Sequence, residues 1–154
     1  MASFNADEMK VIDAMLAELG AGWEGVAKRG LFEGAAVMKD GLLNEVLQLP
    51  ALSDRYYFGK MIPMPALREE EKQGLIDGLR IYKMEKESNG VSVSIGFEGY
   101  NRRNKANTMI ARALVKGTSL NKSDKFVQRA FKTNKQKRIK AISDKIYSIK
   151  IQNK

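Results

Sequence analysis

Four carboxylates fall within one short stretch of the chain and are the first candidates for chemistry. Glu69, Glu70, Glu71 and Asp77 are close enough in sequence to share one short helix, and clustered carboxylates can hold a metal ion. No second set of ligands accompanies them. The pattern therefore favours a solvated acidic first turn of a helix over a metal site, and we expect neither a metal nor a cofactor.

A glycine-punctuated turn is the second candidate. Gly96-Phe97-Glu98-Gly99 follows a predicted strand, as a dinucleotide-binding loop would. It lacks the third glycine and the helix that should follow at once, and Glu98 would repel a phosphate. We reject a phosphate site here.

The chain has neither histidine nor cysteine. The commonest general base, the usual nucleophile pairs and a thiolate zinc site are therefore excluded. Carboxylates, lysine or tyrosine can still serve an enzyme, but the sequence favours a protein without catalysis.

Positive charge is concentrated in the C-terminal third. Residues 101–154 hold 16 Lys and Arg against two acids, a balance of +14, whereas residues 1–100 hold 11 bases against 16 acids, a balance of −5. Such polarity is typical either of contact with nucleic acid or of acidic and basic surfaces that dock on each other. No reading head for bases is recognisable, so any contact with nucleic acid is expected to be non-specific and with the backbone.

The elements that must position these residues predict an α+β fold, with a small antiparallel β-sheet packed against a long helix of the N-terminal half and a basic C-terminal helix. Residues 91–96 alternate apolar and small residues, as a half-buried strand does. Asn89-Gly90 favours a tight turn, which predicts a hairpin of residues 79–87 and 90–97. A short helix then runs over the apolar residues Met109 to Leu114 and closes at Gly117.

Further helices are predicted from apolar spacing. Residues 6–19 carry the stripe Met9, Ile12, Met15 and Leu16, extended by Leu19, within an N-terminal helical region at 1–20. Residues 23–47 read as one long helix whose glycines need either the close approach of another backbone along a small-residue groove or a kink near Gly41. Residues 68–79 form a short helix. Beyond Phe126 the chain is helical, with a stripe formed by Ile139, Ile142, Ile146 and Ile149.

One domain is expected over residues 1–154, with neither a membrane span nor a secretory signal. All three prolines lie in the apolar and aromatic loop 49–68, which is either folded over its own core or an inter-subunit contact. Residues 150–154 are expected as a flexible tail.

The stretch from Val93 to Ser119, followed by Lys125 to Phe131, resembles the tail-component family of tailed phages and prophages, the tail-completion or head–tail joining proteins of the neck. The resemblance lies in a strand that ends in Gly before the turn containing Tyr100, a short helix that ends at Gly117-Thr118, and the phrase Phe126-Val127-Gln128-Arg129-Ala130 before a basic helix. It covers residues 90–147. The proline that many members carry in that phrase is absent here.

The resemblance implies a structural virion protein without catalytic activity, assembled in the host cytoplasm and located in the neck of the tail. It implies a homo-oligomeric ring, a hexamer, with the tail tube or tail terminator on one face and the head-completion protein or connector on the other. Double-stranded DNA would pass through the lumen without specific binding. A non-specific nucleic-acid-binding protein is the alternative. Eight residues are expected at interfaces: Tyr56, Tyr57, Phe58, Arg102, Arg103, Lys132, Lys137 and Arg138.

Overall fold

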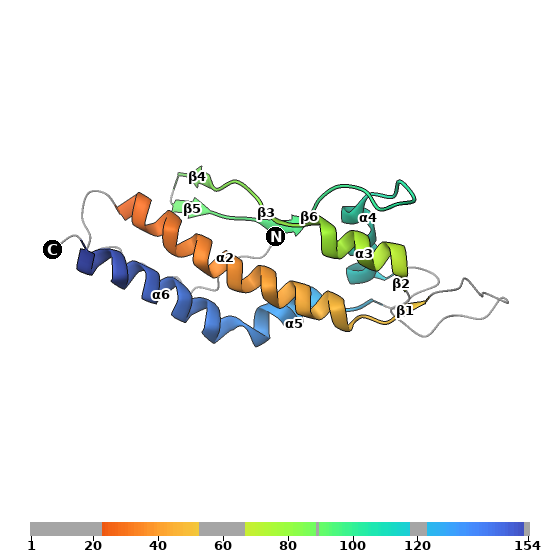
Figure 1. The fold of residues 1–154 in the computed structure, drawn as a ribbon. Coiled ribbons are helices and arrows are strands. Elements are labelled where there is room, and N and C mark those ends of the chain that lie inside the picture. The colour runs from red at the N-terminus through yellow and green to blue at the C-terminus, as the bar shows by residue number, and fades with distance from the viewer. Residues whose placement is uncertain (1–22, 53–66, 89, 118–122, 153–154) are drawn as a thin grey trace. The chain divides into compact units, whose positions relative to one another are not determined.

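A computed structural model describes residues 23–52, 67–88, 90–117 and 123–152 (Figure 1). Within these ranges the chain forms five helices and six short strands, and the expected α+β class is confirmed. The helix expected at 6–19 and most of the Pro-rich loop lie outside the described residues. Of the expected tail, residues 150–152 belong to the last helix.

The chain divides into two compact units. Unit 1 comprises residues 1–39, 81–95 and 133–154, and unit 2 comprises residues 40–80 and 96–132. The single domain expected from the chain length stays a prediction, and each unit is described by itself.

Two antiparallel helices build unit 1, the first part of α2 (Trp23–Gln48) and α6 (Lys135–Gln152) (Figure 1). Isoleucine side chains of α6 pack directly against glycines of α2. A Cβ added at Gly30 would lie 3.0 Å from Cγ1 of Ile146, and one added at Gly34 would lie 2.7 Å from Cδ1 of Ile142. The groove of small residues predicted for this helix is present, but side chains rather than another backbone approach it. Isoleucine side chains fill it, and close packing offsets the low helix propensity of glycine.

The register of this helix pair shifts the buried face of α6 by one residue from the expected stripe. Ile142, Ile146 and Ile149 are buried, but Ile139 is only half-buried and Arg138 takes the fourth place on the face. Arg138 is 4% exposed, and its Nη1 donates to the sulfur of Met38 at 3.6 Å. The packed face of α6 is therefore formed by four residues at spacings of four, four and three: Arg138, Ile142, Ile146 and Ile149.

The predicted hairpin forms, but in two parts. β4 (Glu85–Glu87) pairs antiparallel with β5 (Gly90–Ser92), and β3 (Leu79–Ile81) pairs with β6 (Ile95–Phe97). Gly90, expected in the turn, is the first residue of β5 and lies opposite Glu87, and Asn89 lies outside the described residues. Between the two pairs the hydrogen bond from Tyr82 N to Ser94 O, at 2.8 Å, continues the ladder. All residues from Val91 to Gly96 are half-buried, so the alternation in the sequence does not produce one buried and one exposed face.

Unit 2 packs short elements around one apolar centre. These are the last turns of α2, β1 (Ala51–Leu52), β2 (Leu67–Arg68), α3 (Glu69–Gly78), α4 (Asn107–Lys116) and α5 (Phe126–Thr133). The rings of Phe97 and Phe126 meet with centroids 6.2 Å apart and are tilted by 52°, a favourable aromatic arrangement. The other buried apolar side chains of this centre include Leu42, Val46, Leu49, Leu67, Leu75, Leu79, Ile110 and Leu114.

The ends of the Pro-rich loop are held together in unit 2. β1 and β2 pair in parallel, with Ala51 opposite Leu67. Lys72 on α3 donates to the backbone oxygens of Leu47 and Leu49, both at 2.8 Å. Because the last carbonyls of a helix have no partner within it, the ammonium group caps the C-terminus of α2.

Candidate protein interface

The basic loop 101–105 of unit 2 is closed by its own backbone. Tyr100 and Ala106 form an antiparallel bridge, and Asn101 N donates to Lys105 O at 2.9 Å. Asn104 N donates to Asn101 O at 2.9 Å, and Asn104 adopts a φ of 56°, a left-handed conformation that asparagine tolerates better than most residues. The loop thus has a defined conformation.

The side chain of Asn101 holds the loop from inside. It is 7% exposed, and its Oδ1 accepts hydrogen bonds from the amides of Arg103 and Lys105, both at 3.0 Å. An asparagine that bonds to backbone amides two and four residues later replaces the hydrogen bonds that a ladder would supply. The arginine and lysine side chains can therefore point outward while their amides stay satisfied.

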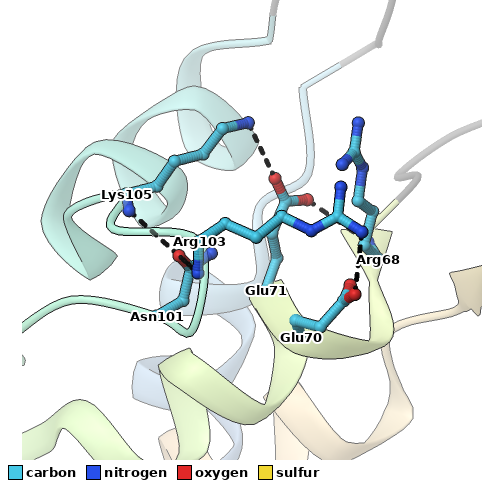
Figure 2. A network of polar contacts seen from close by, with 6 residues as sticks. All are labelled: Arg68, Glu70, Glu71, Asn101, Arg103 and Lys105. Carbon is cyan, nitrogen blue, oxygen red and sulfur yellow. Dashed lines mark hydrogen bonds and ion pairs between the residues drawn. The ribbon is translucent and has the colours of Figure 1, made fainter.

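Two ion pairs connect this loop to the first turn of α3 (Figure 2). Nη2 of Arg103 lies 2.9 Å from Oε1 of Glu70, and Nζ of Lys105 lies 3.1 Å from Oε1 of Glu71. The other carboxylate oxygen of Glu71 accepts from the amide of Arg68 at 3.2 Å. Carboxylates in a first turn also interact favourably with the helix dipole.

The acidic first turn is therefore more than a solvated surface. Two of its three glutamates are committed to the loop, with side-chain exposures of 34% for Glu70 and 14% for Glu71. Exposed ion pairs contribute little to stability, so their main effect is to orient the loop. Arg102, which precedes the two paired cations in the loop, is exposed.

The junction before α4 depends on a buried amide. Asn107 is 2% exposed, and its Nδ2 donates to Glu98 O at 2.8 Å, while its backbone amide donates to Gly99 O at 3.0 Å. Thr108 Oγ1 donates to Phe97 O at 2.7 Å. Gly99 has a φ of 79°, a backbone conformation that residues with a side chain rarely adopt. These bonds fix the angle between β6 and α4.

Two glycines of α3 make room for this junction. A Cβ added at Gly74 would lie 2.6 Å from Oδ1 of Asn107 and 2.8 Å from Cβ of Asn101. A Cβ added at Gly78 would clash with the backbone oxygen of Glu98, which accepts from Asn107. The loop and α4 can approach α3 only because these positions lack side chains.

Beside the loop lies an apolar groove of about 570 Å³. Tyr100 and Met109 line it although they are 69% and 71% exposed, the two most exposed of the large apolar side chains in the described chain. A large apolar residue that is this exposed and adjoins a groove is typical of a binding surface. The remaining groove residues are Leu67, Glu71, Asn104, Lys105, Ala106, Ile110, Ala113 and Leu114.

The residues expected at interfaces fall into four places. Arg102 and Arg103 share the loop, Lys132 is exposed on α5, and Lys137 is exposed on α6. Arg138 is buried in unit 1, so its guanidinium is not presented on the surface. Tyr56, Tyr57 and Phe58 lie outside the described residues.

Sequence analysis did not identify Tyr100, Met109, Asn101 or Asn107 as functional or organising residues. Met109, Ile110, Ala113 and Leu114 fall at helical spacing, which predicts a helix but does not indicate which of these side chains is exposed. The only available signal was the cluster of asparagines around the basic residues, which favours turns that bond to their own backbone.

A second cluster of charges surrounds Arg129 on α5. Its Nε lies 2.8 Å from Oε2 of Glu45, and its Nη2 lies 2.8 Å from Oδ1 of Asp124. The hydrogen bond that Arg129 donates to Glu45, followed by the one that it donates to Asp124, raises the pKa of Arg129 above its ordinary value. Arg129 is thus engaged within unit 2.

The described parts of the chain contain no group of three or more acidic side chains that could hold a metal ion. Among the described helices, none combines the length and the apolar character that crossing a membrane requires. The arrangement around the loop offers exposed apolar side chains, a groove and oriented cations, which suit binding to another macromolecule.

Comparison with known proteins gave no match: no protein-family model, no curated protein and no solved structure matched the chain.

Proposed function

We propose that the protein is a structural subunit of the neck of a phage or prophage particle, a tail-completion or head–tail joining protein without catalytic activity. In this proposal it forms a hexameric ring at the top of the tail. The tail tube or terminator lies on one face, the head-completion protein or connector lies on the other, and double-stranded DNA passes through the lumen. The family resemblance of residues 90–147 motivates the assignment.

The observation that carries it is the surface formed by Tyr100, Met109 and the loop 101–105. An assembly protein needs a contact surface that is shaped before the partner arrives, because ordering a loop on binding costs affinity. Here the Asn101 hydrogen bonds and the two ion pairs to α3 order the loop in advance. The exposed tyrosine and methionine supply apolar contacts of the kind enriched in interfaces.

Imaging of the purified protein by negative stain tests the assembly directly. We expect closed rings of one symmetry, and a monomer at every concentration would overturn the proposal. Turnover of a substrate by the purified protein would overturn the structural role.

Charge reversal in the loop tests the joining role. The combined substitutions Arg102→Glu and Arg103→Glu should block head–tail joining while the far-UV spectrum and the thermal midpoint stay close to those of the parent. Arg103→Gln is the matched control, because it removes the ion pair to Glu70 without placing a like charge beside that carboxylate. Normal head–tail joining by the doubly substituted variant would show that the loop is not part of the interface.

A second function, non-specific binding of nucleic acid, is favoured by one observation. Lys125 and Lys132 in unit 2, and Lys137 and Lys140 in unit 1, are exposed. Lysines of this kind can neutralise phosphates, which gives binding that weakens steeply with salt. A titration of duplex DNA at increasing salt separates the two functions: tight binding with a steep slope favours the second, and weak binding favours the first.

A further inference from the structure

The exposed face of α4 combines apolar and positive side chains. Met109, Arg112 and Lys116 follow one another at helical spacings of three and four, and all three are exposed. Residues at these spacings share one face of a helix. Met109 belongs both to this face and to the groove, which Tyr100 also lines. The lining of the groove contains one cation, Lys105, and one carboxylate, Glu71, which pairs with Lys105. Arg112 and Lys116 lie on the same face of α4 as Met109, outside that lining.

A surface of this composition fits an amphipathic helix with negative charge. Such helices place an apolar stripe into a groove, and charges beside the stripe fix orientation and partner choice. The groove volume of about 570 Å³ is sufficient for several side chains of such a partner.

The chain itself contains a segment of this chemistry. Residues 6–19, whose sequence predicts a helix, carry the apolar stripe from Met9 to Leu19. Over residues 1–20 there are four acids against one base, Lys10. At helical spacing Glu8 falls in line with Ile12 at the start of the apolar stripe, and Asp13 falls at its edge next to Met9. These carboxylates would be the partners of the cations Arg112 and Lys116 on the face of α4 that Met109 shares with the groove.

We propose that residues 6–19 of one copy dock into the groove formed by Tyr100, Met109 and α4 of a second copy. This contact repeats around the ring and gives the acidic first part and the basic last part of the sequence a shared use. The inference rests on the self-association in the proposed function. It adds which surfaces meet, namely the acidic N-terminal segment and the basic face of α4.

Complementary charge reversal tests the contact. One variant carries Arg112→Glu and Lys116→Glu, and the other carries Glu8→Lys and Asp13→Lys. We expect each variant alone to raise the dissociation constant for self-association at least about tenfold, because like charges then meet at every contact. An equimolar mixture should regain the parent affinity, since each face then meets a segment of opposite charge in an alternating ring.

The matched control is Lys28→Glu combined with Arg29→Glu, which makes the same change of charge on exposed positions of α2. Sedimentation velocity over a range of concentrations gives the dissociation constants, and thermal midpoints verify that the variants are folded. The control should associate as the parent does.

A cross-link between copies supplies a second measurement. The chain has no native cysteine, so Met109→Cys in one tagged copy and Met15→Cys in a differently tagged copy report only their own proximity. Oxidation of the mixture should yield the mixed disulfide in high proportion. A Met109→Cys copy mixed with a Gly25→Cys copy should not, because Gly25 lies outside the proposed segment.

The outcomes separate this inference from the proposed function. Rings that form normally in both charge-reversed variants, or a mixture that does not regain affinity, overturn the inference and leave the ring intact as a proposal. A parent protein that stays monomeric overturns both. Recovery of affinity in the mixture, together with the mixed disulfide, supports docking between copies rather than within one copy.

Discussion

The two compact units are stabilised by different kinds of contact. Unit 1 depends on apolar interdigitation, in which Ile142 and Ile146 of α6 lie against Gly34 and Gly30 of α2. Unit 2 adds to its apolar centre a polar junction, in which buried Asn101 and Asn107 bond to backbone groups. Apolar contacts are non-directional and tolerate adjustment, whereas each polar bond requires its own geometry.

This difference predicts where each unit is vulnerable. Removing volume should damage unit 1 most, because a cavity loses contacts and its lining relaxes only in part. Adding volume or removing an amide should damage unit 2 most, because a backbone carbonyl cannot move aside and a buried polar group without a partner is costly.

Ile142→Ala should lower the free energy of unfolding by about 3–4 kcal/mol, the usual cost of truncating a buried isoleucine. Ile142 is fully buried against Gly34. Chemical denaturation measures the change, and Ile139→Ala, at a half-buried position, should cost clearly less. In the Ile142→Ala background, Gly34→Ala should restore part of the loss, since its Cβ would fill the vacated space. Additive effects of the two changes would contradict the proposed contact.

Gly78→Ala should lower the free energy of unfolding by about 2–3 kcal/mol, because the added methyl group would collide with the carbonyl of Glu98. Denaturation measures the total loss, and hydrogen exchange should show it in the amides of α3 and α4. Gly90→Ala is the control, since nothing lies within 4 Å of a Cβ at that position. Equal stabilities for the two variants would show that α3 and α4 can separate at little cost.

Asn101→Ala should cost about 1–2 kcal/mol, because the amides of Arg103 and Lys105 lose their acceptor inside the loop. Faster hydrogen exchange confined to residues 101–106 would identify the loop as the site of the change. Asn104→Gly is the comparison: it keeps the left-handed conformation accessible and should leave exchange close to that of the parent. Unchanged exchange in the alanine variant would mean that the backbone bonds alone hold the loop.

The Arg103–Glu70 ion pair should contribute only about 0.2–1 kcal/mol, as partly exposed pairs do. A double-mutant cycle with Arg103→Ala and Glu70→Ala measures this coupling at low salt, and 1 M salt should remove most of it. A coupling well above this range would place the pair among the main determinants of the fold of unit 2. The pair would then do more than orient the loop.

The smallest effect concerns Glu24 in unit 1. Its hydrogen bond to Lys86, the largest contribution, lowers the pKa of Glu24 below its ordinary value, although the carboxylate is exposed. Because the folded-state pKa of Glu24 is lowered, the ion pair stabilises the folded protein above the ordinary pKa of about 4.5. This stabilisation disappears as the pH falls through the lowered pKa. In the Lys86→Met variant the pKa of Glu24 should rise toward its ordinary value, which a carbon-13 NMR titration measures. An unchanged pKa would show that Lys86 of the hairpin does not pair with Glu24.

The apolar spacing of the sequence was sufficient to predict the fold class and the described helices, except for the break between α5 and α6. Ala27, Leu31, Ala35, Met38, Leu42 and Val46 recur at helical spacing and are all buried in the observed α2. The helix over residues 68–79 was also predictable, since acidic first turns act locally. The strands of the hairpin were predictable as well, but Gly90 belongs to β5 and does not adopt the positive φ that the expected Asn-Gly turn requires. The periodic spacing of apolar residues and the local preferences of the backbone are set by residues that are close in sequence. They can therefore be read from a single amino-acid sequence.

Three features were decided only by the tertiary structure. Arg138 rather than Ile139 joins the packed face of α6, because the register against Gly34 and Met38 selects it. Met109, which falls at helical spacing with Ile110 and Leu114, is exposed beside the groove, because the buried face of α4 is the one that carries Ile110 and Leu114.

The third feature is the pairing between the basic loop and the acidic turn. Glu70 and Arg103 are 33 residues apart, and their contact depends on how α3 and α4 pack. Acidic and basic stretches, and the absence of histidine and cysteine, can be read directly from the amino-acid sequence. Which charges neutralise each other, and which remain for a partner, followed only from the packing, because electrostatic and steric contacts act through distance in space rather than in sequence.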